Sequence, residues 1–186
     1  ILFKEISSGA NNGCTNASAI FTISESPVDL SITANAIKNA NCTEDGIIAA
    51  QAQGGTVPYT YQVTSSATAP LASDASWVSG NTFTRAGTIA GTLYYVYAKD
   101  AFGCIKQNTV TVLRDEDPTI TAPTPICYDG STPFTINISG TVDPDIVGGA
   151  TYSVNGSAFQ TSSSFTFNAA GTYNLVIKDG NGCTAN

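Results

Sequence analysis

Apolar and polar residues alternate over short stretches of the chain, and one arrangement of such stretches is used more than once. Residues 91–104 and 171–183 each begin with Gly-Thr, continue as an alternating stretch and end in Gly-Cys. Alternation places every second side chain on the same face of a β-strand. The residues that share the apolar face are Tyr94, Val96 and Ala98 in the earlier stretch and Tyr173, Leu175 and Ile177 in the later one. Repeated use of one unit predicts a repeat protein.

Each alternating stretch leads into a tight turn and a cysteine. Asp100–Gly103 and Asp179–Gly182 contain the aspartate and glycine residues that turns between neighbouring strands favour. We expect Asp100 and Asp179 to shape these turns by accepting hydrogen bonds from nearby backbone amides. A third, weaker copy of the turn is Asn11–Cys14.

The repeated turn divides the chain into three parts. Residues 1–25 are expected to be the C-terminal piece of a truncated repeat, residues 26–116 a complete β-sandwich repeat, and residues 117–186 a second repeat that lacks its last strand. Both ends then fall inside a repeat, which indicates a segment of a longer chain. The strands predicted for the complete repeat are Val28–Ile32, Ile47–Ala52, Tyr59–Val63, Trp77–Val78, Thr82–Thr84, the alternating stretch after Gly91, and Thr109–Leu113.

Short strands with frequent turn signals predict the fold class. They are typical of an all-β protein built from tandem immunoglobulin-like antiparallel β-sandwich repeats, here in an elongated array. Tyr94 and Tyr173 each open the alternating strand of their repeat. At this place a tyrosine hydroxyl can bond to upstream backbone, a feature known as a tyrosine corner. A tyrosine that packs without this hydrogen bond is the alternative.

Composition and charge exclude several classes of partner. The net charge is −7, and the seven basic residues are scattered rather than clustered, so we expect no nucleic-acid partner. The acidic balance fits a solubility role in a secreted protein, with a cationic ligand as the alternative. No stretch is long and apolar enough to cross a bilayer, so no membrane span is expected in this segment.

The chain has five cysteines, and four of them occupy equivalent places in the two longer repeats. The expected disulfides are Cys42–Cys104 and Cys127–Cys183, one within each repeat, with buried free thiols as the alternative. Cys14 is expected to lack a partner in this segment. Disulfides form in oxidising compartments, so the protein is expected to act outside the cytoplasm. The chain has no Cys-x-x-Cys pair and no histidine, which argues against a zinc or redox site.

Candidate chemistry is sparse. A chain without histidine cannot form a Ser-His-Asp triad, and it has no phosphate-binding glycine loop, so we expect no enzyme activity. Calcium is the one cofactor that the sequence suggests. Asp115, Glu116 and Asp117 lie between the two longer repeats, where a calcium ion would stiffen the junction, and solvated turn residues are the alternative. The aromatic residues that would either stack on sugars or pack within and between repeats are Trp77, Phe102 and Tyr128.

Three motifs follow one another in the complete repeat: Cys42–Gly46, Gly54–Tyr61 and Gly91–Cys104. The second repeat keeps the first and third motifs but lacks the proline of the middle one. This combination resembles the SprB-type repeat of very large cell-surface adhesins of Bacteroidetes, including those of gliding motility. The resemblance implies export through the type 9 secretion system, display at the outer membrane and movement by the motility machinery. It brings no catalytic or ligand-binding motif.

The sequence therefore predicts a structural stalk of an exported cell-surface adhesin that serves surface attachment and gliding motility. Its expected partners are neighbouring repeats of the same chain, the secretion and motility machinery that the resemblance implies, and surface polysaccharide. Two alternatives stay open. The repeats themselves bind glycans or the substratum, or the chain is an accessory region of a secreted enzyme.

Overall fold

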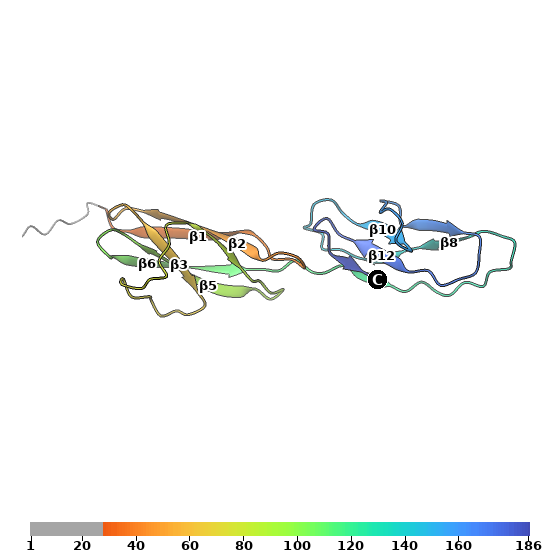
Figure 1. The fold of residues 1–186 in the computed structure, drawn as a ribbon, viewed down its shortest axis with the longest axis horizontal. Helices are drawn as coiled ribbons and strands as arrows, with labels where there is room; N and C mark the ends of the chain where they lie inside the picture. Colours follow the sequence, from red (N-terminus) through yellow and green to blue (C-terminus); the bar gives the residue numbers. More distant parts are fainter. Residues whose placement is uncertain (1–27) are drawn as a thin grey trace, which may run out of the picture.

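The computed structural model describes residues 28–186 as two β-sandwich units that lie end to end (Figure 1). No helix occurs among the described residues. The expected repeat piece at residues 1–25, which contains Cys14, lies outside them. The strands of the first unit, repeat 1, are β1 (Ser31–Lys38), β2 (Gly46–Gln53), β3 (Thr60–Thr64), β4 (Thr82–Arg85), β5 (Thr92–Lys99) and β6 (Ile105–Val112). The strands of the second unit, repeat 2, are β7 (Thr119–Thr121), β8 (Phe134–Asn137), β9 (Ser139–Thr141), β10 (Thr151–Val154), β11 (Ser164–Phe167), β12 (Leu175–Lys178) and β13 (Thr184–Ala185).

Repeat 1 consists of two antiparallel three-stranded sheets, with strand orders β1-β2-β4 and β3-β5-β6. Their facing sides bury the alternating apolar residues that the sequence indicates, because every second side chain of each strand points into the same core. Ile48, Val96 and Val112 are fully buried there. Burial of this apolar surface stabilises the sandwich at about 25 cal/mol for each Å² removed from water.

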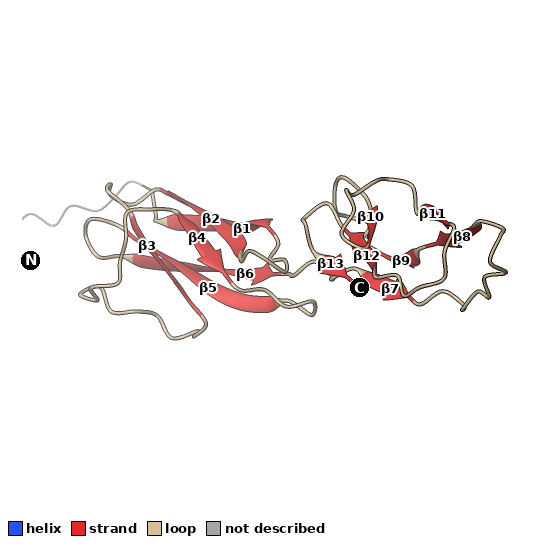
Figure 2. Cartoon of the chain, turned by 45° about the vertical axis from the view of Figure 1, so that its right-hand side comes forward, coloured by secondary structure: helices blue, strands red, loops and turns tan. Residues whose placement is uncertain are grey.

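Repeat 2 uses the same strand order with shorter strands. Its second strand is broken at Ile138 into β8 and β9, which pair with β11 and β7 respectively, and the other sheet is β10-β12-β13. Its buried cluster is smaller than that of repeat 1 and centres on Ile138, Val154 and Leu175. The predicted fold class, all-β with immunoglobulin-like sandwiches, is confirmed, and Figure 2 shows the strands of both units from a second direction.

The tyrosine corner is present in both repeats. The Tyr94 hydroxyl donates to the carbonyl oxygen of Ala86 at 2.9 Å, and the Tyr173 hydroxyl donates to that of Ala169 at 2.7 Å. Each bond ties the start of the alternating strand to the segment that precedes it, which confirms the tyrosine-corner interpretation.

The prediction for the first strand is wrong in its bounds. The sequence predicts a strand at Val28–Ile32, whereas β1 begins at Ser31 and continues to Lys38. The inward side chains beyond Ile32 are Ala34 and Ala36, which pack against the core. Alanine is a weak signal of a strand, so the sequence pattern fades where the strand continues.

Candidate functional site at the junction of the two repeats

The segment that connects the repeats, residues 113–118, is held to both of them. In repeat 1 the amide of Ala40 donates to the carbonyl oxygen of Leu113, and the amide of Asp115 donates to that of Ala40, both at 2.9 Å. In repeat 2 the side chain of Asp143 accepts a hydrogen bond from the amide of Glu116 at 3.2 Å. The connection therefore continues the line of β6 along the first loop of repeat 1 (residues 39–45) rather than crossing open solvent.

Asp115 links the two repeats through its carboxylate. Its Oδ1 accepts a hydrogen bond from the Asn39 side-chain amide of repeat 1 at 2.7 Å. Its Oδ2 accepts one from the Asn181 side-chain amide of repeat 2 at 2.9 Å. All three side chains are half-buried. Hydrogen bonds to a charged acceptor are stronger than neutral ones, so this carboxylate fastens both units at one point.

A disulfide joins the repeats beside this carboxylate. It links Cys42, in the first loop of repeat 1, to Cys183, at the hairpin turn of repeat 2 (residues 179–183), with a Cα–Cα distance of 5.8 Å that is normal for the bond. The expected pairings Cys42–Cys104 and Cys127–Cys183 are therefore wrong. Cys104 and Cys127 are free and exposed.

The physical reason for the different pairing is the length of the sandwich. Cys104 directly precedes β6 at the hairpin turn of repeat 1 (residues 100–104), whereas the first loop, with Cys42, bonds to Leu113 just beyond the other end of β6. Eight residues of strand span about 26 Å at roughly 3.3 Å each, far beyond the reach of a disulfide. Loop and hairpin cysteines of one repeat thus lie at opposite ends, and the two cysteines that meet within residues 28–186 belong to consecutive repeats.

The hairpin turns are shaped by aspartate, as the sequence predicts. Asp100 Oδ1 accepts hydrogen bonds from the amides of Phe102 and Cys104 at 3.0 and 2.9 Å. In repeat 2, Asp179 Oδ1 accepts from the amides two and four residues later, at 2.9 and 2.8 Å. Both aspartates are buried, with 4% and 3% of their surface exposed. They hold the cysteine that follows each turn in a fixed position.

The two aspartates differ in their second oxygen, which gives a matched pair of variants. Oδ2 of Asp100 accepts a hydrogen bond from the amide of Thr56 at 3.1 Å, whereas Oδ2 of Asp179 has no hydrogen-bond partner among the described residues. In Asp100→Asn an NH2 group replaces one of the accepting oxygens, and this donor then faces either the Thr56 amide or the amides of the turn. We expect it to destabilise repeat 1 by about 1–3 kcal/mol. Asp179→Asn can turn its amide toward the unbonded side, and we expect a smaller loss in repeat 2.

Amide hydrogen exchange, resolved for each repeat, measures both losses. The wild-type chain supplies the reference opening free energies. Equal losses in the two variants would contradict the role given to the Thr56 amide.

Two of the three acidic residues proposed for calcium, Asp115 and Asp117, already have side-chain partners. Both oxygens of Asp115 accept side-chain amides, and Asp117 pairs with Arg114 at 2.8 Å. Among the described residues, the one grouping of three potential metal-ligand side chains combines Asp117 with the two half-cystines, and sulfur in a disulfide is not a thiolate ligand. A calcium ion would have to displace these interactions, so calcium binding stays an untested prediction.

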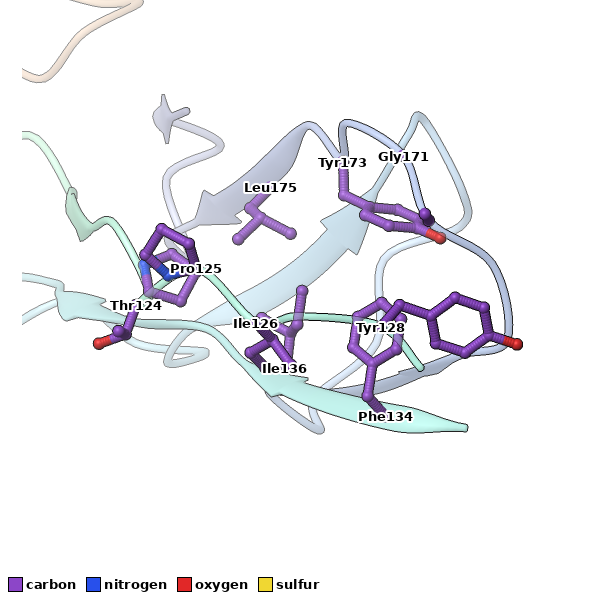
Figure 3. Close-up of a pocket in the computed structure, with 11 residues that line it drawn as sticks. Thr124, Pro125, Ile126, Tyr128, Phe134, Ile136, Gly171, Tyr173 and Leu175 are labelled. Carbon is purple, nitrogen blue, oxygen red and sulfur yellow. The ribbon is translucent and has the colours of Figure 1, made fainter. Parts of the chain in front are cut away.

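A second feature is an apolar groove in repeat 2, shown in Figure 3. It has a volume of about 380 Å³ and lies between residues 123–128, β8 and the segment before β12. The rings of Tyr128 and Tyr173 both face Phe134, at centroid distances of 5.7 and 6.3 Å. Their hydroxyls donate to backbone oxygens at Asn168 and Ala169, each at 2.7 Å. The groove is thus lined mainly by packed apolar surface, with both tyrosine donors used inside the repeat.

The three aromatic residues that the sequence suggests for sugar stacking lie apart. Tyr128 packs within repeat 2, as described above. The Trp77 ring lies under the Lys99 ammonium group at 4.8 Å, and its indole N–H donates to the carbonyl oxygen of Leu71 at 2.9 Å. Phe102 projects from the hairpin turn of repeat 1 with 66% of its surface exposed. The structure brings none of these rings together into a shared platform.

Comparisons with known proteins identify no family for this chain. No protein-family model matches the chain, and no curated protein matches it. Among solved structures, the chain is similar to the fibronectin(III)-like modules of Clostridium thermocellum CbhA, at 15% sequence identity. The likeness covers 84% of this chain and 90% of that one, with a TM-score of 0.32. A likeness at this level carries no argument about function, so the fold class rests on the observed strand order.

Among residues 28–186 there is no helix with the length and apolar character needed to cross a membrane. The absence of enzyme activity also stays a prediction.

Proposed function

We propose that this chain is a stiff stalk segment of an exported cell-surface adhesin, with SprB-type repeats that serve attachment and gliding motility. The observation that carries the proposal is the disulfide between repeats that lie end to end. A link of this kind stabilises one relative placement of the two units, which a spacer needs. Export is supported by the disulfide, because such bonds persist in oxidising compartments. The SprB-type assignment is supported by the motif combination in the sequence.

Three further contacts support stiffness. The Asp115 carboxylate bonds to both repeats, the amide of Glu116 bonds to Asp143 of repeat 2, and the backbone of Asp115 bonds to the first loop of repeat 1. Units joined at several points, one of them covalent, move together, whereas units joined by a single flexible linker do not. Each repeat then contacts its neighbour along one axis, as in other repeat arrays.

The competing function is glycan binding by the repeats themselves. Sugar sites combine aromatic faces with a few well-placed polar groups. The groove of repeat 2 offers apolar faces, and both of its tyrosine hydroxyls are already bonded to backbone. These observations favour the stalk over the binding module.

The test combines shape and binding, measured on the full oxidised chain. We expect small-angle X-ray scattering to give the same elongated particle at low and high salt, and a glycan array to give no concentration-dependent signal. Antibodies against the chain should label intact, non-permeabilised cells of the native organism. Saturable binding to a glycan would contradict the stalk and establish the binding module. A scattering profile of two independently moving units would also contradict it.

A further inference from the structure

The two free cysteines occupy the same positions as the two that are bonded. Cys104 ends the hairpin turn of repeat 1, as Cys183 ends that of repeat 2. Cys127 lies in the first loop of repeat 2 (residues 122–133), as Cys42 lies in the first loop of repeat 1. In Figure 1 the first loop of repeat 2 reaches the end of the molecule that faces away from repeat 1. The hairpin turn of repeat 1 lies at the other outer end, one strand length from the junction.

The two hairpin turns present their cysteines in the same way. The amide of Asp100 donates to the carbonyl oxygen of Cys104 at 3.1 Å, and the amide of Asp179 donates to that of Cys183 at 3.0 Å. The amides of the two cysteines in turn donate hydrogen bonds to the aspartate side chains, at 2.9 and 2.8 Å. The glycine before each cysteine has a φ of 86° or 90°, a conformation that favours glycine. Cys104 is therefore held in the same backbone geometry as Cys183, which forms a disulfide.

We propose that Cys104 and Cys127 each form an inter-repeat disulfide of the same kind as Cys42–Cys183, with a cysteine of a neighbouring repeat. Cys127 bonds the hairpin cysteine of a following repeat of this type, and Cys104 bonds the first-loop cysteine of a preceding one. The rule is that the first loop of each repeat is linked to the hairpin turn of the next, so a longer array is cross-linked at every junction. This goes beyond the proposed function, because it holds for any such array whatever the array attaches to.

The side chains beside the two free cysteines are apolar and exposed. Phe102, two residues before Cys104, is 66% exposed, and Ile126, directly before Cys127, is 49% exposed. At the occupied junction the corresponding neighbours are polar, namely Asn181 and Asn41. A repeat like repeat 1 that follows a repeat like repeat 2 would bring Phe102 and Ile126 together and remove apolar surface from water. Docking of two repeats at these ends is thus favoured by their exposed residues.

The first loop of repeat 2 has to shift for this contact. Cys42 lies four residues before the start of β2 at Gly46, whereas Cys127 lies seven residues before the start of β8 at Phe134. Pro123 and Pro125 have no amide hydrogen, and their segment makes no ladder with β8. A shift of this loop therefore breaks no strand pairing.

The turn after Cys127 supports one side of this loop. The backbone amides of Thr132 and Ser131 donate to the Asp129 carboxylate and lower its pKa to about 2, from an ordinary 3.8. A lowered pKa means that the turn is stabilised by the charged form. That stabilisation is present above pH 4 and is lost as the pH falls toward 2. At the pH of disulfide formation the turn is therefore in its stabilised form.

The chemistry of the link balances with one named oxidant. Each thiol gives up its proton, the two sulfurs form one S–S bond, and the two released electrons reduce the disulfide of an oxidising thiol–disulfide oxidoreductase to a dithiol. The same oxidant class forms Cys42–Cys183, so no further reactant is needed.

The test is a tandem duplication that places Cys127 of one copy and Cys104 of the next in one chain. Residues 1–183 are joined to residues 15–186, so that the sequence after Cys14 completes repeat 2 of the first copy. We expect non-reducing peptide mapping after alkylation to give a Cys104–Cys127 peptide, in addition to Cys42–Cys183 from each copy. The Cys42–Cys183 peptide, together with the absence of alkylated Cys42, reports that both copies fold. Cys127→Ser in the first copy should abolish the new peptide and leave Cys42–Cys183 unchanged.

The proposal is overturned by a duplicated chain in which Cys42–Cys183 forms in both copies while Cys127 of the first copy and Cys104 of the second remain alkylated, so that no Cys104–Cys127 peptide appears. If the duplicated chain does not fold, the test is made with the single chain in a glutathione redox buffer. There, head-to-tail dimers linked through Cys104 and Cys127 support the proposal. Symmetric Cys104–Cys104 and Cys127–Cys127 dimers, or no covalent dimers, contradict it.

Discussion

Replacement of Cys42 by serine is expected to destabilise repeat 2 by about 2–5 kcal/mol, although Cys42 belongs to repeat 1. The residue is an exposed member of the first loop of repeat 1, so the substitution leaves the core of repeat 2 intact. Its effect acts through the lost tether on the hairpin turn at Cys183. Repeat 2 is sensitive to this loss because its buried cluster has three residues, whereas that of repeat 1 has eleven.

Amide hydrogen exchange with peptide resolution measures this effect. The opening free energies of β10 and β12 should fall in Cys42→Ser, while those of β2 and β5 in repeat 1 stay near the wild-type values. Cys104→Ser is the matched control, since it replaces a free exposed cysteine of the same repeat and is expected to change neither. Unchanged exchange in β10 and β12 of Cys42→Ser would show that the tether does not stabilise repeat 2.

Asp115→Ala is expected to weaken the junction by about 2 kcal/mol. The variant removes the acceptor of two side-chain amides, one on each repeat, at 2.7 and 2.9 Å. Hydrogen bonds to a charged group contribute about 1.5–3 kcal/mol each, and half-exposure of the three side chains reduces their sum. The effect should be largest in the Cys42→Ser background, where the covalent link no longer holds the repeats.

Residual dipolar couplings measured by NMR test this expectation. Two repeats that move together share one alignment tensor, and repeats that move apart acquire two. We expect one tensor in Cys42→Ser and two in Cys42→Ser combined with Asp115→Ala. Asp117→Asn is the matched control, because Asp117 is exposed and its salt bridge with Arg114 stays within the connection. One shared tensor in the double variant would contradict the bridging role of Asp115.

Much of each repeat follows from local sequence. The alternating strand, the tyrosine corner and the aspartate that shapes the hairpin turn all depend on residues within about ten positions of one another. Such features are readable because the strand period and turn chemistry act locally. The bounds of β1 are less readable, since Ala34 and Ala36 carry little strand signal.

The disulfide pairing depends on the folded arrangement of both repeats. Equivalent cysteines in each repeat suggest a bond within the repeat, because sequence alone counts positions and not the ends of a sandwich. Strand direction decides the matter, since the first loop and the hairpin turn lie at opposite ends of β6. The two cysteines that do bond are 141 positions apart.

The bridging role of Asp115 also cannot be predicted from local sequence, because its partners lie far away along the chain. Its acidic surroundings suggest a cation, and the sequence gives no sign of the two asparagines that bond to it. They lie 76 and 66 positions away, one on each side of the junction. Only the placement of two folded units brings them to one carboxylate.

The inter-repeat disulfide also determines how the chain carries mechanical load. Tension applied to the two ends passes from Cys42 directly to Cys183, and residues 43–182 lie in a covalent loop outside the load path. Cys42 and Cys183 are 141 positions apart in the sequence. Without the bond, unfolding of the segment between them would lengthen the chain by as much as about 480 Å, at roughly 3.4 Å per residue. With overlapping loops of this kind at successive junctions, the filament stays nearly inextensible even where a single repeat loses its fold.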